Sequence, residues 1–194
     1  MIFKPKKKPE GFDNNENNKF LNLNSKLEEA NIKRKKGETD RAIKLYKQIL
    51  KSDNKVCEAH FNLALIYKQL DLLDDSLHEF GKVIKLEPEN INAYLMIGNI
   101  FSNKKQFNEA LNFYKKGKSL NSKDPFILNG IGNIYQNLFN YQKAIEYFNK
   151  AIYYFPNNAG FHNNLGNSQL SILEFDISIK SFKKAIELDP DIRE

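Results

Sequence analysis

The chain has 194 residues, of which 41% are hydrophobic and 28% charged, and its net charge is +6. This length suits one domain or one short repeat array, and the apolar content is enough to form a buried core. The single cysteine excludes a disulfide framework and no run approaches the roughly 20 apolar residues of a membrane span, so we expect a cytoplasmic protein in a reducing compartment.

Residues 1–22 are basic and rich in asparagine, and we expect them to form a flexible tail. No apolar stretch follows their lysines, which excludes a secretory signal. The net charge is +2 in this tail, and it is +5, −4, +4, +1 and −2 in the successive 34-residue blocks that begin at residue 23. Because the sign alternates, the chain lacks the continuous basic stripe that phosphate contacts need, which argues against nucleic acid as a partner.

Residues 23–192 consist of consecutive 34-residue blocks that align without insertion or deletion. A period of this length indicates stacked helical units that bury a shared core. Residues 193–194 start no further block, and we treat them as an unfinished end. The blocks are 23–56, 57–90, 91–124, 125–158 and 159–192.

Residue types recur at fixed positions when each block is counted from its first residue. Positions 8 and 20 hold small residues, which allow two antiparallel helices to approach closely, and an aromatic residue at position 24 fills the space between helix pairs. Position 32 is proline in three blocks, which ends the second helix before the next block begins. Position 8 reads Ala30, Ala64, Gly98, Gly132 and Gly166, and position 24 reads Tyr46, Phe80, Tyr114, Phe148 and Phe182.

This pattern resembles the tetratricopeptide repeat family over residues 23–192. The resemblance implies an all-α, right-handed superhelical solenoid of antiparallel helix pairs, with the first helices lining a concave groove and the second helices facing outward. Lys33 and Gln169 at position 11 and Gly117 at position 27 depart from the family's pattern.

The two ends of the array differ. Lys26, Glu29 and Lys33 of the first block stand where other blocks are mostly apolar, so the array begins there. Phe182 and Ile186 of the last block have no following helix to cover them. We expect the chain to be the amino-terminal fragment of a longer protein, and the alternative is self-association through this end.

The sequence contains no motif for catalysis or metal binding. His60 and His162 occupy position 4, a packing position, and His78 lies on a second helix; no zinc, phosphate-loop or nucleophile motif is present. The glycines at position 8 are explained by helix contact rather than by phosphate binding. We therefore expect no enzyme activity, metal, cofactor or small-molecule substrate for this chain.

Asparagines recur on the first helices, at positions that face the groove in peptide-binding members of the family. An Asn amide donates and accepts a hydrogen bond at once, which suits the backbone of an extended peptide. The alternative is that they reflect composition, since 26 of the 194 residues are asparagine. The predicted peptide-binding residues are Asn31, Asn62, Asn99, Asn129, Asn133, Asn163, Asn164 and Asn167.

The sequence thus predicts a protein–protein interaction scaffold or adaptor that binds an extended segment of a partner protein. The alternative is the substrate-recognition arm of a larger transferase, protein O-glycosyltransferase-like or sulfotransferase-like, whose catalytic domain would lie outside this chain. Similar asparagine ladders occur in the repeats that precede protein O-linked sugar transferases. A third hypothesis, nucleic-acid binding through the first block and the tail, predicts binding that weakens steeply with salt.

Overall fold

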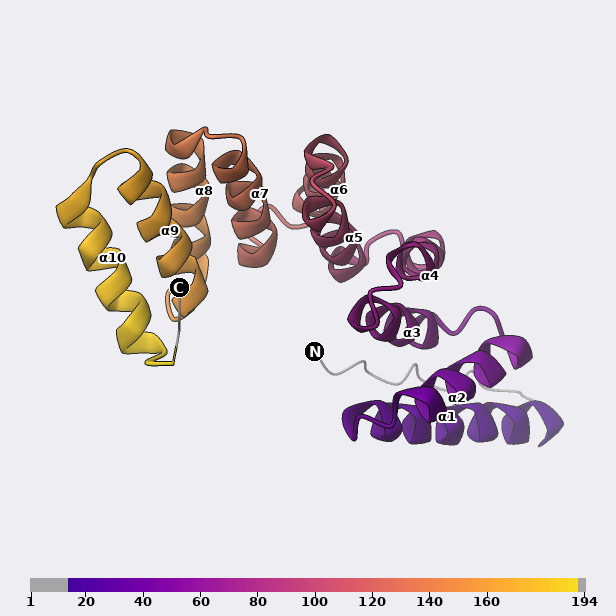
Figure 1. Ribbon diagram of the computed structural model, residues 1–194. Helices are drawn as coiled ribbons and strands as arrows, with labels where there is room; N and C mark the ends of the chain where they lie inside the picture. Colours follow the sequence, from indigo (N-terminus) through magenta and orange to yellow (C-terminus); the bar gives the residue numbers. More distant parts are fainter. Residues whose placement is uncertain (1–13, 192–194) are drawn as a thin grey trace. The chain divides into compact units, whose positions relative to one another are not determined.

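The computed structural model describes residues 14–191, and the described residues form ten α-helices and no strand (Figure 1). The helices come in five antiparallel pairs, one for each 34-residue block, and we number these blocks repeats 1 to 5. This confirms the predicted all-α fold. The first helices of the repeats are α1 (Asn14–Lys35), α3 (Cys57–Gln69), α5 (Ile91–Asn103), α7 (Pro125–Asn137) and α9 (Ala159–Ser171). The second helices are α2 (Thr39–Ser52), α4 (Leu73–Leu86), α6 (Phe107–Leu120), α8 (Tyr141–Tyr154) and α10 (Phe175–Leu188).

The helix boundaries keep the register of the sequence. In repeats 2 to 5 the first helix spans positions 1–13, and in all five repeats the second helix spans positions 17–30. Pro88, Pro156 and Pro190 each stand two residues after a second helix ends, as predicted from their position in the block. None of the described helices has the length and apolar character that crossing a lipid bilayer requires.

The first helix is longer than the repeat pattern predicts. Helix α1 begins at Asn14, so residues 14–22 of the predicted tail are helical rather than flexible. No proline or glycine interrupts the chain between Asn14 and Lys35, and the many polar residues there hide any apolar periodicity that would have marked the helix. The rest of the predicted tail and the last residues of the chain, 192–194, lie outside the described residues.

Several asparagines have a purely local role at helix N-termini. The side chains of Asn90, Asn140 and Asn158 each accept a hydrogen bond from a backbone N–H in the first turn of α5, α8 and α9. Asp124 does the same for α7, where Pro125 occupies the first turn. Such caps satisfy donors that a helix start would otherwise leave unpaired.

In repeats 3 to 5 the glycine at position 8 packs against the aromatic ring at position 24 of the same repeat. A Cβ atom added at Gly132 would lie 2.6 Å from the Phe148 ring, and one at Gly166 would lie 2.7 Å from the Phe182 ring. Such distances leave no room for a side chain, so these glycines serve helix contact, as predicted. Phe182, which has no following helix to cover it, is still half-buried, because its ring packs against Gly166 of its own repeat.

The turn between the two helices of each repeat has one residue in the left-handed region, always at position 15. Repeat 1 uses Gly37 there, with a φ of 73°. The other four repeats place a residue with a side chain at this position, which costs conformational energy that glycine avoids. These residues are Asp71, Lys105, Phe139 and Leu173.

Contacts divide the chain into two compact units, Met1–Glu79 and Phe80–Glu194. In the first unit, Tyr46 and Ile49 of α2 are fully buried among residues of α1 and α3. In the second unit, Tyr114 of α6 is buried with Ile127 and Ile131 of α7, so the core runs from one repeat into the next. Each repeat therefore buries its apolar side partly against its neighbour.

Candidate peptide-binding face

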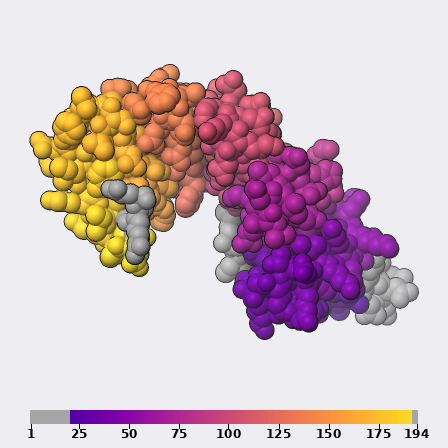
Figure 2. All heavy atoms as spheres, viewed as in Figure 1, coloured from indigo at the N-terminus to yellow at the C-terminus, as the bar shows by residue number. Residues whose placement is uncertain are grey.

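The first helices of the second unit form one layer. Helix α7 contacts α5 on one side and α9 on the other, whereas neighbouring second helices in this unit make at most marginal contact with one another. Because the first helices are packed more closely than the second helices, this unit curves with α5, α7 and α9 on the inner side. Figure 2 shows the orange and yellow atoms of repeats 4 and 5 packed directly against each other.

The open side of this layer is lined by amide and hydroxyl side chains and by Leu170, and we call it the amide face. Its members lie at positions 5, 9, 12 and 13, which follow one side of a helix. All of them are exposed or half-buried, whereas Leu95 at position 5 of α5 is buried and is not a member. The amide face consists of Asn99, Ser102 and Asn103 of α5, Asn129, Asn133, Gln136 and Asn137 of α7, and Asn163, Asn167, Leu170 and Ser171 of α9.

Two of the predicted asparagines bond to a tyrosine in the core of their own repeat. The hydroxyl of Tyr46 donates to Oδ1 of Asn31 at 2.6 Å, and the hydroxyl of Tyr114 donates to Oδ1 of Asn99 at 2.6 Å. Burial raises the pKa of Tyr46 to about 12 and raises that of Tyr114 as well. In these repeats the asparagine at position 9 satisfies the buried hydroxyl at position 24.

The first unit uses its asparagines in an internal network. Besides accepting from Tyr46, Oδ1 of Asn31 accepts from Nδ2 of Asn62 at 2.9 Å, and Nδ2 of Asn31 donates to Glu58 at 2.8 Å. Asn62 is itself buried. The two predicted binding residues of this unit are therefore already held by partners within the chain.

The second unit leaves several predicted asparagines available. Nδ2 of Asn164 donates to Oδ1 of Asn129 at 3.0 Å, which links α9 to α7. Within the described residues, the side-chain amides of Asn133, Asn163 and Asn167 have no hydrogen-bond partner and are exposed or half-buried. Position 24 explains the difference for Asn133 and Asn167, because repeats 4 and 5 have phenylalanine there and so present no hydroxyl to position 9.

An aromatic cluster lies beside the amide face and was not singled out from the sequence. The ring of Phe126 on α7 lies 5.6 Å from that of Phe161 and 5.9 Å from that of Phe155. Phe161 is buried, whereas Phe126 is 46% and Phe155 is 41% exposed. Phe126 occupies position 2, three residues before Asn129 on the same side of α7, and that spacing was the signal that could have identified it.

The departure at position 11 of repeat 5, Gln169, has its own pairing with position 23. Repeats 3 and 4 stack two aromatic rings at these positions, Phe101 on Phe113 and Tyr135 on Tyr147. Repeat 5 instead forms a buried hydrogen bond, in which the Ser181 hydroxyl donates to Gln169 at 2.7 Å. The side chain at position 11 is thus matched to its partner rather than left unpaired.

Two of the three histidines, His60 and His162, take structural roles. His60 is 2% exposed, and its ring nitrogens bond to Glu79 and to the backbone oxygen of Asn54. His162 is half-buried and bonds to the backbone oxygen of Pro156 at 2.8 Å. Among residues 14–191, no three or more histidine, cysteine, aspartate or glutamate side chains are grouped to hold a metal ion.

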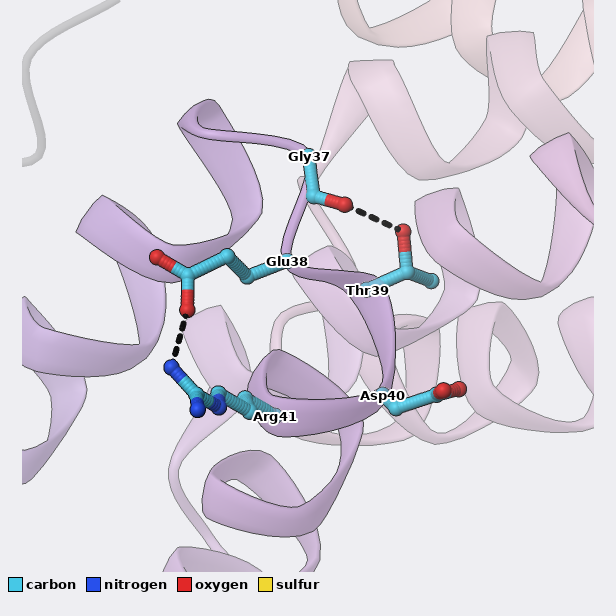
Figure 3. A pocket seen from close by; sticks show the side chains of 5 residues that line it. All are labelled: Gly37, Glu38, Thr39, Asp40 and Arg41. Atoms are coloured by element: carbon cyan, nitrogen blue, oxygen red, sulfur yellow. Dashed lines mark hydrogen bonds and ion pairs between the residues drawn. The ribbon is translucent and has the colours of Figure 1, made fainter.

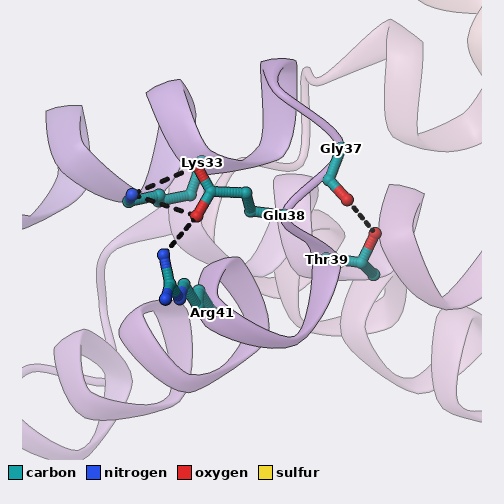
Figure 4. A network of polar contacts seen from close by, with 5 residues as sticks. All are labelled: Lys33, Gly37, Glu38, Thr39 and Arg41. Carbon is teal, nitrogen blue, oxygen red and sulfur yellow. Dashed lines mark hydrogen bonds and ion pairs between the residues drawn. The ribbon is translucent and has the colours of Figure 1, made fainter.

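A shallow depression at the turn between α1 and α2 is lined by Gly37, Glu38, Thr39, Asp40 and Arg41 (Figure 3). Glu38 accepts from Lys33 at 3.1 Å and from Arg41 at 2.7 Å, and the Thr39 hydroxyl donates to the backbone oxygen of Gly37 (Figure 4). The bonds from Lys33 and Arg41 lower the pKa of the Glu38 carboxyl. This explains the departure at Lys33, which fastens the turn.

The last helix presents apolar residues to solvent. Ile179 and Ile186 of α10 are 50% and 54% exposed. The equivalent residues of repeat 4, Ile145 and Ile152, pack against the core next to Leu165 of α9. The expectation of an uncovered apolar surface is thus met by Ile179 and Ile186 within the described residues.

Comparison with known families decides the identity of the fold. Models described as tetratricopeptide repeat match residues 27–83, 91–124, 125–158 and 159–192. The chain belongs to the tetratricopeptide repeat family. The matches over residues 91–124, 125–158 and 159–192 have the same boundaries as repeats 3 to 5, so these three tetratricopeptide repeats coincide with helix pairs of the structure.

Solved structures with the same fold include tetratricopeptide repeat proteins of similar length. A crystal structure of MamA protein is 24% identical, covers 89% of this chain and 97% of its own, and has a TM-score of 0.72. YrrB, described as a TPR protein with an unusual peptide-binding site, is 21% identical over 86% of each chain, with a TM-score of 0.65. PilF of Pseudomonas aeruginosa is 15% identical over 85% of this chain and 75% of its own, with a TM-score of 0.76. A search of curated proteins finds no match.

Proposed function

We propose that this tetratricopeptide repeat protein is an interaction scaffold that binds an extended segment of a partner protein on the amide face of its second unit. The observation that carries the proposal is the set of unpartnered amides of Asn133, Asn163 and Asn167 on neighbouring helices α7 and α9. Each amide can donate to and accept from a peptide backbone, which supports binding whatever the peptide's side chains are.

The contacts favour the second unit over the first as the binding site. Asn31 and Asn62 bond to each other and to neighbours, so a peptide would have to replace those bonds to gain new ones. When a peptide binds, Asn133 and Asn167 lose only their hydrogen bonds to water. YrrB shows that a protein of this fold can carry a peptide-binding site.

The test begins with dodecapeptides selected from a displayed random library on the full chain, with dissociation constants measured by fluorescence anisotropy. We expect the double substitution Asn133→Ala and Asn167→Ala to weaken binding of the selected peptides by about tenfold, since it removes several hydrogen bonds of roughly 0.5 to 1.5 kcal/mol each. The melting temperature should stay within about 5 °C of the parent, because neither amide has an internal partner.

The matched control is Asn108→Ala with Asn149→Ala, two exposed asparagines on the second helices α6 and α8. This variant should bind like the parent. If the Asn133 and Asn167 variant binds as tightly as the parent, or if no peptide is enriched at all, the proposal is wrong.

Self-association through α10 stays a separate proposal, with a second copy of the chain as the occupant. It rests on Ile179 and Ile186, whose equivalents in repeat 4 are covered by the next repeat. Sedimentation equilibrium should show a dimer that the substitutions Ile179→Lys and Ile186→Lys abolish. A parent chain that stays monomeric up to its solubility limit would reject it.

A further inference from the structure

The three first helices of the second unit contain no charged residue. Helices α5, α7 and α9 have 13 residues each, and none of these is aspartate, glutamate, lysine or arginine. The whole chain is 28% charged, and the second helices packed behind this layer carry lysines and acids, such as Lys115 and Glu146.

Burial alone does not explain this absence of charge. Many residues of these helices are exposed or half-buried, among them Asn137, Asn167 and Ser171. The equivalent helix of the first unit, α3, carries Glu58 and Lys68 in the same structural role. The uncharged surface is therefore a property of the second unit and not of first helices in general.

From this surface we infer the chemical class of the partner: an extended segment without charged side chains, which combines amide or hydroxyl groups with an aromatic or aliphatic anchor. The inference rests on the proposed function. A charged side chain laid on the amide face would lose hydration and meet no opposite charge, so it is selected against. An uncharged polar side chain keeps its hydrogen bonds, because amides both donate and accept.

The aromatic cluster supplies the place for the anchor. Phe126 and Phe155 are each nearly half exposed, and the buried ring of Phe161 holds Phe126 from behind at 5.6 Å between ring centroids. An aromatic or aliphatic side chain placed against these rings buries apolar area without an electrostatic cost. Because Phe126 is on α7, the anchor lies on the same helix as Asn133.

One consequence concerns regulation of the partner. Adding a phosphate to a serine or threonine of the bound segment would place close to two negative charges on a face without cations. Phosphorylation of the partner within the bound segment should therefore release it.

The library selection described above tests the inference through the composition of the bound peptides. In the pool selected on the full chain, the share of aspartate, glutamate, lysine and arginine should fall to about half of that in the unselected library. Replacing one central serine or threonine of a selected peptide by phosphoserine or phosphothreonine should weaken its binding by about tenfold. A pool as charged as the unselected library, or one enriched in either sign, would overturn the inference.

A charge introduced into the face gives the sharper comparison. On the variant Asn133→Asp with Asn167→Asp, the selected pool should become enriched in lysine and arginine by about twofold, while the control Asn108→Asp with Asn149→Asp should select the uncharged pool of the parent. If the share of lysine and arginine in the selected pool does not change, the peptides bind elsewhere and the inference is wrong.

The proposed function and the inferred partner class would be overturned by different results. Peptides that are charged yet bind more weakly to the Asn133→Ala and Asn167→Ala variant would overturn the partner class and keep the proposed function. Selected peptides that bind equally well to that variant would overturn the proposed function itself.

Discussion

The residue at position 24 determines whether the asparagine at position 9 has a hydrogen-bond partner in the core of its repeat. Tyr114 is buried and donates to Asn99, so that asparagine completes the core of repeat 3. Phe148 at the same position in repeat 4 leaves Asn133 without an internal partner. One hydroxyl group therefore separates an asparagine that stabilises the fold from one without an internal partner.

We predict that the substitution Tyr114→Phe lowers the free energy of unfolding near neutral pH but not at high pH. Burial raises the pKa of Tyr114 above the usual value of 10.0, so the unfolded chain releases this proton first and the stability that the tyrosine contributes below pH 10.0 is lost as the pH rises beyond it. The substitution should cost about 1 kcal/mol at about pH 8 and close to nothing at about pH 11.

Urea unfolding of both proteins at the two pH values measures this difference. The control is Tyr153→Phe, since Tyr153 is strongly exposed and the loss of its hydroxyl should leave the free energy of unfolding at about pH 8 unchanged. A cost for Tyr114→Phe that is the same at both pH values would show that the hydroxyl is not buried as described.

At the scale of the element, the turn inside each of repeats 2 to 5 holds a residue other than glycine in the left-handed backbone region. Leu173 has a φ of 65° between α9 and α10, and its side chain is 70% exposed. Its backbone conformation suits glycine, while its side chain contributes little packing. The interhelical turn of repeat 1, where Gly37 occupies the same position, is free of this strain.

The substitution Leu173→Gly should raise stability by about 0.5 to 1 kcal/mol, because relief of the left-handed strain exceeds the entropy that glycine adds to the unfolded chain. Thermal unfolding should show a melting temperature a few degrees higher. Leu170→Gly, at an exposed site inside α9, should instead lower stability by about 1 kcal/mol. A loss of stability in both variants would contradict the argument.

The period of 34 residues was enough to predict the helix pairs, because small residues such as Gly132 and prolines such as Pro156 recur in phase. It could not predict the strained turns, since only Gly37 among the residues at position 15 signals a left-handed conformation. The start of α1 at Asn14 was missed because a polar helix shows no apolar periodicity.

The candidate site could be predicted only in part. Position alone grouped Asn31 and Asn99 with Asn133 and Asn167, although the structure gives the first two a tyrosine partner. The spacing of 15 residues between position 9 and position 24 was visible in the sequence and would have separated them. The pairing of Asn31 with Glu58 could not have been read from one sequence, because it depends on how α1 packs on α3.

At the scale of the whole molecule, the two units use the same repeat for different purposes. The first unit ties its polar groups together through Asn31, Glu58 and the buried pair of His60 and Glu79. The second unit has no aspartate, glutamate, lysine or arginine on α5, α7 and α9, and it leaves the amides of Asn133 and Asn167 without an internal partner. In our proposal, a chain that repeats one structural unit thus uses the polar groups of some copies for stability and those of others for recognition.

The most direct measurement is a titration of the labelled chain with a selected peptide, followed through the asparagine side-chain amide signals in nuclear magnetic resonance. Our account predicts that the signals of Asn133, Asn163 and Asn167 move as peptide is added, while those of Asn31, Asn108 and Asn149 stay in place. Shifts confined to Asn31 or to the second-helix asparagines would contradict it.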